Sequence, residues 1–205
     1  ESINKKFDWI VACFTETSKG YKFEINVLKS LKLKTKANLF LDATGSIGLE
    51  KGHEIADLIA FSSCKGLLGL TGGAFLGKKA KIKQNKLVDS PFYLNYTTHK
   101  EKLVTGPYHI IQGLFHIKKI HHSLLENIRL FHLEFLIKYK DLLVWNLDNQ
   151  PKLCTLIKAN IESYSDKKVI TYNSREMQSD HSIVCHLHAI DNKNINDYEK
   201  YFKIS

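Results

Sequence analysis

Apolar residues in the first 80 positions come in short runs separated by polar connections. The runs fall at 9–14, 38–41, 57–61 and 72–77, and each has the length of a buried strand. Residues 24–36 instead carry apolar positions at helical spacing among lysines, which predicts a surface helix. Strands that alternate with longer connections in this way indicate an α/β sheet whose strands are mostly parallel.

The pattern changes after residue 80. Residues 81–108 look irregular, and the apolar spacing over 108–145 predicts one long helix without an internal proline. Residues 182–190 alternate as a strand does, and residues 194–202 have the spacing of a helix. We expect three parts, with these bounds: 1–115 as part of a large domain, 116–145 as a long linking helix, and 146–205 as a small, incomplete α+β domain.

Composition is ordinary for a globular chain, with 43% hydrophobic and 25% charged residues. No apolar run is long enough to cross a membrane, and no signal segment opens the sequence. The net charge is +9, but two of the 30 basic residues are arginines and the other 28 are lysines. Proteins that read nucleic acid favour arginine, so we interpret the lysines as solubilising surface and expect no nucleic-acid or membrane partner.

Neither the cysteines nor the histidines predict a metal centre. The four cysteines lack the paired spacing of metal ligands, and most lie in or beside apolar runs, which is typical of buried thiols in a reducing cytoplasm. Among the ten histidines, His121 and His122 are adjacent in the sequence. His186 and His188 are two residues apart in a predicted strand and would face the same side of it. A zinc site needs three or four converging ligands, so we interpret the histidines as surface or partly buried residues.

Polar clusters follow three consecutive predicted strands. They are residues 15–17 (TET), Asp42, and residues 62–66 (SSCKG). Because parallel strands gather their carboxyl ends at one edge of a sheet, these groups are expected to form one site. Each cluster alone is better explained by helix capping or by a turn, and it is the convergence of three consecutive strand ends that favours a site.

Lys65 is the most informative residue of these clusters. Small residues surround it in the sequence, and small residues let a bulky ligand approach the backbone. A lysine that is partly shielded from water can form a Schiff base. A phosphate-binding loop of the nucleotide type is excluded by the order, because Lys65 precedes the glycines rather than following them.

Three segments together resemble the central block of class V aminotransferases, which are pyridoxal-phosphate enzymes of fold type I. They are residues 16–20 (ETSKG), 42–48 (DATGSIG) and 62–66 (SSCKG), with Asp42 lying 23 residues before Lys65. Residues 104–109 (VTGPYH) are similar to the Thr-x-Pro segment of that family. The resemblance covers roughly residues 7–115, and the subgroup it favours is 2-aminoethylphosphonate–pyruvate transaminase.

The resemblance implies a role for each matching residue. Lys65 would hold pyridoxal 5'-phosphate as a Schiff base and move the proton, and Asp42 would pair with the pyridinium nitrogen. Ser62 would bind the cofactor phosphate, and Thr17 and Glu16 would lie near the ring hydroxyl. Thr105 would reach the phosphate of a neighbouring subunit, so the implied unit is a homodimer with shared active sites.

The implied fold is the later part of an aspartate-aminotransferase-like large domain, with a mixed, mostly parallel sheet, followed by a small α+β piece. The implied reaction is amino-group transfer from a small amino donor to a 2-oxo acid such as pyruvate, in the cytoplasm. Alanine–glyoxylate and serine–pyruvate transaminases share the pattern and stay open as alternatives. A cysteine desulfurase is disfavoured because Cys64 stands where those enzymes have histidine.

Two parts of the family pattern are not found in the sequence. The phosphate-cradling turn and the stacking aromatic would precede residue 7, and the substrate-binding arginine has only Arg175 as a weak match. We therefore interpret the sequence as an internal piece of a longer protein or as a decayed gene product. A truncated, non-catalytic homologue that only dimerises is the competing interpretation, and cofactor binding separates the two.

Overall fold

The computed structural model describes residues 7–82, 101, 108–159, 161–163, 171–173, 180–191, 195–196 and 202–204. Its first unit is a four-stranded sheet in the order β1-β4-β5-β6. The strands are β1 (Trp9–Cys13), β4 (Asn38–Asp42), β5 (Leu58–Ser62) and β6 (Ala74–Lys78). The first three are parallel and β6 is antiparallel to β5, so the sheet is mixed and mostly parallel.

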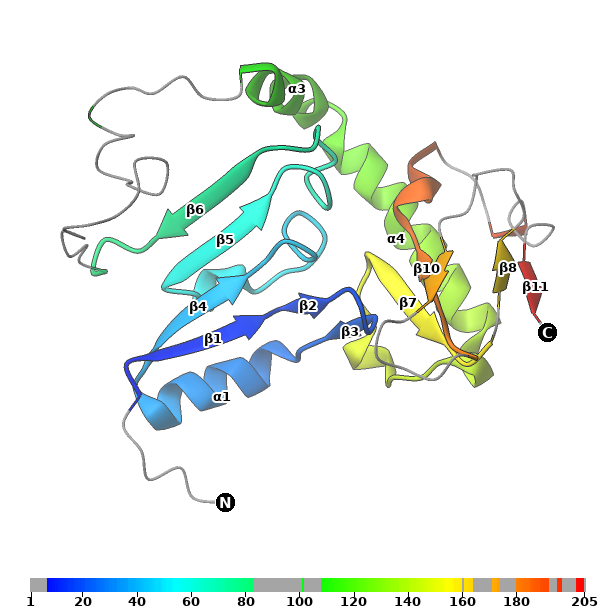
Figure 1. Ribbon diagram of the computed structural model, residues 1–205, viewed down its shortest axis with the longest axis horizontal. Helices are drawn as coiled ribbons and strands as arrows, with labels where there is room; N and C mark the ends of the chain where they lie inside the picture. Colours follow the sequence, from blue (N-terminus) through cyan, green and yellow to red (C-terminus); the bar gives the residue numbers. More distant parts are fainter. Residues whose placement is uncertain are drawn as a thin grey trace.

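Among the described residues, one face of this sheet is covered and the other is open. Leu39 and Leu41 of β4 are fully buried, and Leu41 packs with Leu28 of helix α1 (Ile25–Thr35), which lies along β1 in Figure 1. On the opposite face Val11 is 70% exposed and Leu76 is 58% exposed. Strand residues alternate between faces, so the open face is the one that carries Asp42 and Ser62.

A short hairpin connects β1 with α1. It consists of β2 (Thr15–Glu16) and β3 (Tyr21–Lys22), which pair antiparallel. The turn between them ends at Gly20, whose positive φ of 54° brings its backbone against Leu156 of the second unit. The hairpin therefore joins the large sheet to the C-terminal part of the chain.

The second unit packs a helix on a small antiparallel sheet (Figure 1). The sheet has the order β7-β10-β9, with β7 (Cys154–Ile157), β10 (Ser182–Cys185) and β9 (Thr171–Asn173). A separate pair is formed by β8 (Ile161–Ser163) and β11 (Phe202–Ile204). Phe131 and Phe135 of α4 (His121–Lys138) pack on Ile157 and Val184. No described helix is long and apolar enough to cross a membrane.

The long helix expected over residues 108–145 is in fact two helices, so this prediction was wrong. α3 (Tyr108–Lys118) ends before a turn at Lys119 and Ile120, and α4 then runs only to Lys138. No proline or glycine marks the break. Tertiary packing causes it, because Ile110 of α3 contacts the glycines before β6 whereas Ile128 of α4 packs into the second unit.

Two predictions near the C-terminus were also incomplete. The strand expected over 182–190 stops at Cys185, and residues 187–191 form the 3₁₀ turn η5. The turn places Ala189 in the core with Phe131 and Val184. The helix expected over 194–202 lies mostly outside the described residues, and Phe202 belongs to β11. The remaining short 3₁₀ turns are η1 (His53–Ile55), η3 (Lys140–Leu142) and η4 (Leu147–Asn149).

A buried histidine pair lies between α4 and the end of β10. The Nδ1 atoms of His132 and His186 are 3.3 Å apart, and His186 Nδ1 also donates to the Lys152 carbonyl at 3.0 Å. Burial lowers the pKa of His132 to about 4, helped by the charges of Lys22 and Lys152. Burial and the neighbouring His132 also lower the pKa of His186. Both rings are therefore neutral in the folded chain near pH 7.

Acidification is expected to destabilise the second unit through this pair. The unfolded chain binds a proton at each histidine near pH 6.5 and the folded chain does not, so stability falls as the pH drops from 6.5 to 4. His132 alone should account for about 3 kcal/mol over this interval. Urea denaturation at pH 7, 5.5 and 4 measures the loss. His132→Asn should flatten the pH dependence, whereas the exposed-site control His122→Asn should not; equal pH slopes in the two variants would contradict the assignment.

Candidate active site

Three parallel strands end at the same edge of the large sheet. Cys13 of β1 is in register with Asp42 of β4, and Asp42 is in register with Ala60 of β5. Ser62 lies two residues beyond Ala60, so it shares the face of Cys13 and Asp42. The expected gathering of strand ends is therefore present in the structure.

Lys65 lies in the turn after β5. Its Nζ is 3.4 Å from Oγ1 of Thr17, which comes from the β2–β3 turn 48 residues earlier. Both residues are half-buried. The contact is longer than a strong hydrogen bond, but it brings an amine and a hydroxyl together from two separate turns.

Asp42 ends β4 and begins a tight turn. Its Oδ1 accepts a hydrogen bond from the Thr44 amide at 2.9 Å, as the turn-forming alternative predicts. The Asp42 residue is exposed. The reason is its position on the open face of the sheet, where the neighbouring Val11 is exposed too. The carboxylate is therefore accessible to a ligand on that face.

Cys13 was missed as a site residue because the sequence shows only an apolar run around it. Its thiol donates to the Thr15 carbonyl at 3.1 Å. Burial, together with the carboxylates of Asp42 and Glu16, raises the pKa of the Cys13 thiol to about 11, although the bond to the Thr15 carbonyl and the Lys65 ammonium act in the opposite direction. The thiol is therefore neutral near pH 7, and the register of the sheet places it beside Asp42.

Glu16 is held locally within the β2–β3 turn. Its Oε1 accepts from the Ser18 amide at 2.9 Å and from the Ser18 hydroxyl at 2.8 Å. These bonds fix the turn that carries Thr17. Glu16 thus supports the position of Thr17, and a direct role toward a ligand stays a prediction.

The loop from 63 to 73 is closed by Ser63 rather than by Ser62. The buried Ser63 hydroxyl accepts from the Gly73 amide at 3.1 Å, and the Ser63 carbonyl accepts from the Gly69 amide at 2.8 Å. Ser62 stays at the open face, with its Oγ 3.5 Å from the Cys64 sulfur. The structural role of Ser63 could not be found from the sequence, since it depends on a contact across ten residues.

Gly66 fixes the turn of Lys65 against the turn of Asp42. A Cβ on Gly66 would lie 1.9 Å from the Ile47 carbonyl oxygen, and a Cβ on Gly48 would lie 2.5 Å from the Gly66 oxygen. His121 Nε2 donates to the same Gly66 oxygen at 2.9 Å from the start of α4. The two turns and α4 therefore meet at a single backbone position next to Lys65.

Gly66→Ala is expected to destabilise the chain and displace Lys65. A methyl group cannot fit beside a backbone oxygen at that distance, so one of the two turns must move, at a cost of about 1–3 kcal/mol. Gly113→Ala is the matched control, because its Cβ would meet only Leu70 side-chain atoms at 3.8 Å and the residue lies inside α3. Chemical denaturation should show a loss for the first variant and a gain of about 0.5–1 kcal/mol for the second. Unchanged stability of Gly66→Ala would show that the two turns are not locked together.

The core behind these turns connects them to the second unit. Leu49 follows the Asp42 turn and packs with Ile128 of α4 and Leu156 of β7, with Leu68 against the same cluster. Burial raises the pKa of the Cys185 thiol at the end of β10, and the charge of Lys65 partly offsets this. The second unit therefore supports the Lys65 region from behind.

Two predicted residues cannot be placed. Thr105 and Arg175 lie outside the described residues. Among the described residues there is no group of three or more His, Cys, Asp or Glu side chains that could hold a metal ion.

Comparison with family models and with curated proteins finds no match. Solved structures do match. An alanine–glyoxylate aminotransferase from Nostoc sp. superposes with a TM-score of 0.68 at 14% identity, over 90% of this chain and 59% of its own. An aspartate aminotransferase of subgroup IV from Thermus thermophilus gives 0.70 at 12% identity, over 96% of this chain and 63% of its own. A pyridoxamine–pyruvate aminotransferase from Mesorhizobium loti gives 0.67 at 18% identity, over 87% and 54%.

These likenesses establish the fold. The chain has the aminotransferase fold expected from the sequence, with a mixed, mostly parallel sheet, and it spans about 60% of the length of the first solved structures it matches.

Proposed function

We propose that this chain is the later part of a pyridoxal-phosphate-dependent aminotransferase, with Lys65 as the residue that binds the cofactor covalently. One observation carries the proposal: the Lys65 amine lies 3.4 Å from the Thr17 hydroxyl, beside the edge where Asp42 and Ser62 share one sheet face. These groups come from three separate segments. The similarity to solved aminotransferases supports the same interpretation at the level of fold.

The residues present fit the chemistry of pyridoxal phosphate. The cofactor supplies an aldehyde and an electron-withdrawing pyridinium ring when bound. An amine is needed for the aldehyde, a carboxylate for the ring nitrogen, and hydroxyl groups for the phosphate and the ring hydroxyl. Lys65, Asp42, Ser62 and Thr17 provide these groups in that order.

Each residue has a defined task in this proposal. Asp42 accepts a hydrogen bond from the protonated ring nitrogen and, as an ionised carboxylate, keeps that proton in place. With the cofactor bound, the Lys65 amine would take the proton from the substrate α-carbon and pass it to the C4′ carbon of the cofactor. Glu16 holds the turn of Thr17 through its two bonds to Ser18.

The identity of the substrates is also part of this proposal, and it rests on the sequence resemblance. We favour amino transfer to a 2-oxo acid such as pyruvate, as in 2-aminoethylphosphonate transaminase, on the resemblance of residues 16–20, 42–48 and 62–66. Alanine–glyoxylate and serine–pyruvate transamination remain alternatives within the same class. The same proposal includes a cytoplasmic homodimer with shared active sites. In it, Thr105 of one subunit would reach the cofactor phosphate bound by the other.

A truncated, non-catalytic homologue is the second candidate. The open sheet face favours it, because Asp42 and Val11 are exposed on the side where the proposed ligand would bind. Such a chain would keep the fold without assembling a working site.

Reductive trapping separates the two candidates. The purified chain is incubated with pyridoxal phosphate, reduced with borohydride and digested, and the modified lysine is located by mass spectrometry. A pyridoxyl group confined to Lys65 supports the cofactor site, since the chain has 27 other lysines to compete. Labelling spread over many lysines, or none, would assign the chain to the non-catalytic class.

A further inference from the structure

A pocket lies at the opposite end of the large sheet from Asp42. It encloses about 410 Å³, and Asn38, the first residue of β4, is part of its lining. β4 spans five residues to Asp42, and each strand residue advances about 3.3 Å, so the two places are roughly 13 Å apart. The pocket is therefore distinct from the candidate active site.

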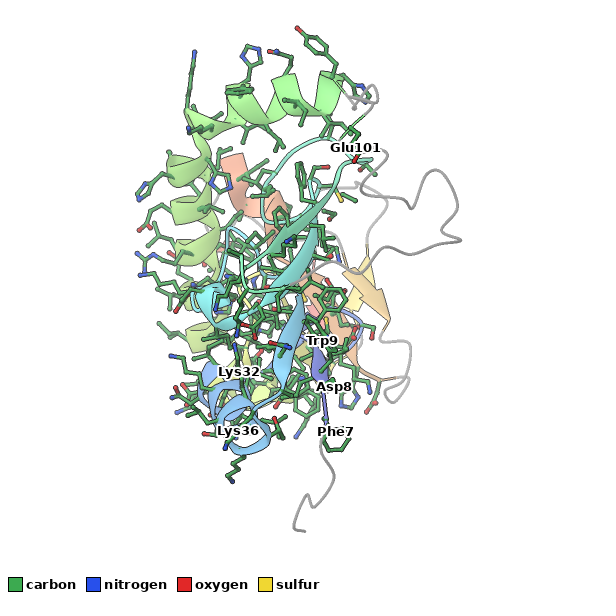
Figure 2. All side chains as sticks on the ribbon, turned by 90° about the vertical axis from the view of Figure 1, so that its left-hand side faces the viewer. Phe7, Asp8, Trp9, Lys32, Lys36 and Glu101 are labelled. Carbon is green, nitrogen blue, oxygen red and sulfur yellow. The ribbon has the colours of Figure 1, made fainter. Side chains whose placement is uncertain are left out.

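Five lysines line this pocket, which we call the lysine pocket. Lys29 and Lys32 lie on one side of α1, Lys36 is the residue that caps the C-terminal end of α1, and Lys79 and Lys81 follow β6. Figure 2 shows Lys32 on α1 and Lys36 just after its end, near the end of the sheet where Trp9 begins β1. Two separate segments thus bring like charges to one hollow.

The fully buried Asp57 orients part of this cluster. Its carboxylate oxygens lie 2.6 Å from Lys32 Nζ, 2.9 Å from Lys81 Nζ and 3.8 Å from Lys79 Nζ. Lys32 Nζ also donates to the Ile55 carbonyl at 2.7 Å. The lysines on both sides of the lysine pocket are therefore fixed in direction by one carboxylate.

The lysine pocket has more positive charge than Asp57 can balance. Asp57 offsets one of the five ammonium groups, and none of the described residues lining the pocket is acidic. Like charges held close together repel, and a bound anion removes that repulsion. Because the lysines come from two segments, an anion with several linked charged groups can contact both segments at once.

The rest of the lining is apolar. Leu33 is 78% exposed beside the lysines, and Ala37 and Ile55 complete this part of the wall. The methylene stems of the lysines add further apolar surface. The wall leaves room for an uncharged group attached to the anion.

We propose that the lysine pocket binds an oligophosphate, whose linked phosphate groups bridge the α1 lysines and the lysines after β6. The phosphates can be inorganic or can belong to a nucleotide, since both offer the same chain of charged oxygens. This assignment is independent of the proposed cofactor function, because it uses none of the residues around Lys65.

Calorimetric titration of the full chain with sodium tripolyphosphate tests the proposal. Binding should be measurable at low salt and weaken as salt is raised. Lys29→Gln combined with Lys36→Gln should weaken binding at least about tenfold, since two charge-assisted contacts are lost. Lys34→Gln combined with Lys119→Gln removes the same charge from exposed positions outside the lysine pocket and should change the affinity less than about twofold.

Two further titrations define the ligand. Orthophosphate should bind much more weakly than tripolyphosphate, because it cannot bridge the two segments. ATP binding as tightly as tripolyphosphate would support recognition of the phosphate chain alone, and tighter ATP binding would support an added contact at Leu33. The proposal is overturned if tripolyphosphate does not bind, if orthophosphate binds equally well, or if the two double variants lose affinity to the same extent.

Discussion

Lys65→Ala is expected to abolish specific labelling of this chain by pyridoxal phosphate and borohydride. The expectation follows from the position of its amine, 3.4 Å from Thr17 and beside the strand end that carries Asp42. Lys65→Arg should fail in the same way, since a guanidinium keeps the charge but does not form a Schiff base with an aldehyde. Mass spectrometry after reduction measures the loss at this one position.

Substitution of Asp42 tests the proposed function through the rate of amino transfer. Asp42→Asn keeps the size of the side chain and can still accept from the Thr44 amide, but it lacks the charge that holds a proton on a ring nitrogen. The rate of amino transfer should fall about 100-fold or more, as for loss of one preorganised electrostatic partner. Asp148→Asn, at an exposed position, and Lys118→Ala, on the surface of α3, are the controls. Labelling that persists in Lys65→Ala would remove the basis of the proposed function.

Asp57→Ala is expected to have the largest effect on stability, about 4 kcal/mol. The carboxylate is completely buried, accepts from the Leu39 amide at 2.9 Å, and lies 2.6 Å from Lys32 Nζ and 2.9 Å from Lys81 Nζ. Its removal leaves a buried amide of β4 unpaired and the lysine groups facing one another. Urea denaturation measures the change, with the exposed Asp148→Ala as the control that should stay within about 0.5 kcal/mol.

The contribution of Asp57 has a defined pH range. Hydrogen bonds from Lys32, Leu39 and Lys81 outweigh the cost of burial and hold the pKa of Asp57 well below its usual value. A carboxyl group with a depressed pKa stabilises the folded chain above its unfolded pKa near 4 and loses that effect as the pH falls further. The difference between the parent chain and Asp57→Ala should therefore be constant from pH 7 to 5 and shrink below pH 4. A difference smaller than 1 kcal/mol at pH 7 would show that the lysines carry no structural role.

The strands and the first helix could be predicted because their signals are local. The apolar runs at 9–14, 38–41, 57–61 and 72–77 became β1, β4, β5 and β6, and residues 24–36 became α1. A strand buried in a sheet must be apolar along its own length, so its sequence alone reveals it. The same holds for the polar clusters at the strand ends, since parallel strands bring those ends together whatever the packing details.

Contacts between distant residues could not be predicted in this way. The break at Lys119 and Ile120 has no local signal, because it arises from α3 packing on one unit and α4 on the other. Cys13 looked like an ordinary buried thiol until register placed it beside Asp42. Asp57 looked like the first residue of a strand, and only the fold brought Lys32, Lys79 and Lys81 to it.

By itself the sequence determined the α/β class, the order of the strands in the chain, and the residues that meet at the Lys65 edge of the sheet. These features depend on periodicity and on the direction of parallel strands, and both can be inferred from short segments of the sequence. The tertiary structure decided which face of the sheet is open, how Gly66 locks two turns to α4, and where five lysines line one pocket with three of them around the Asp57 carboxylate. Those features depend on distances between residues far apart in the chain, and such distances are set only when the whole core packs.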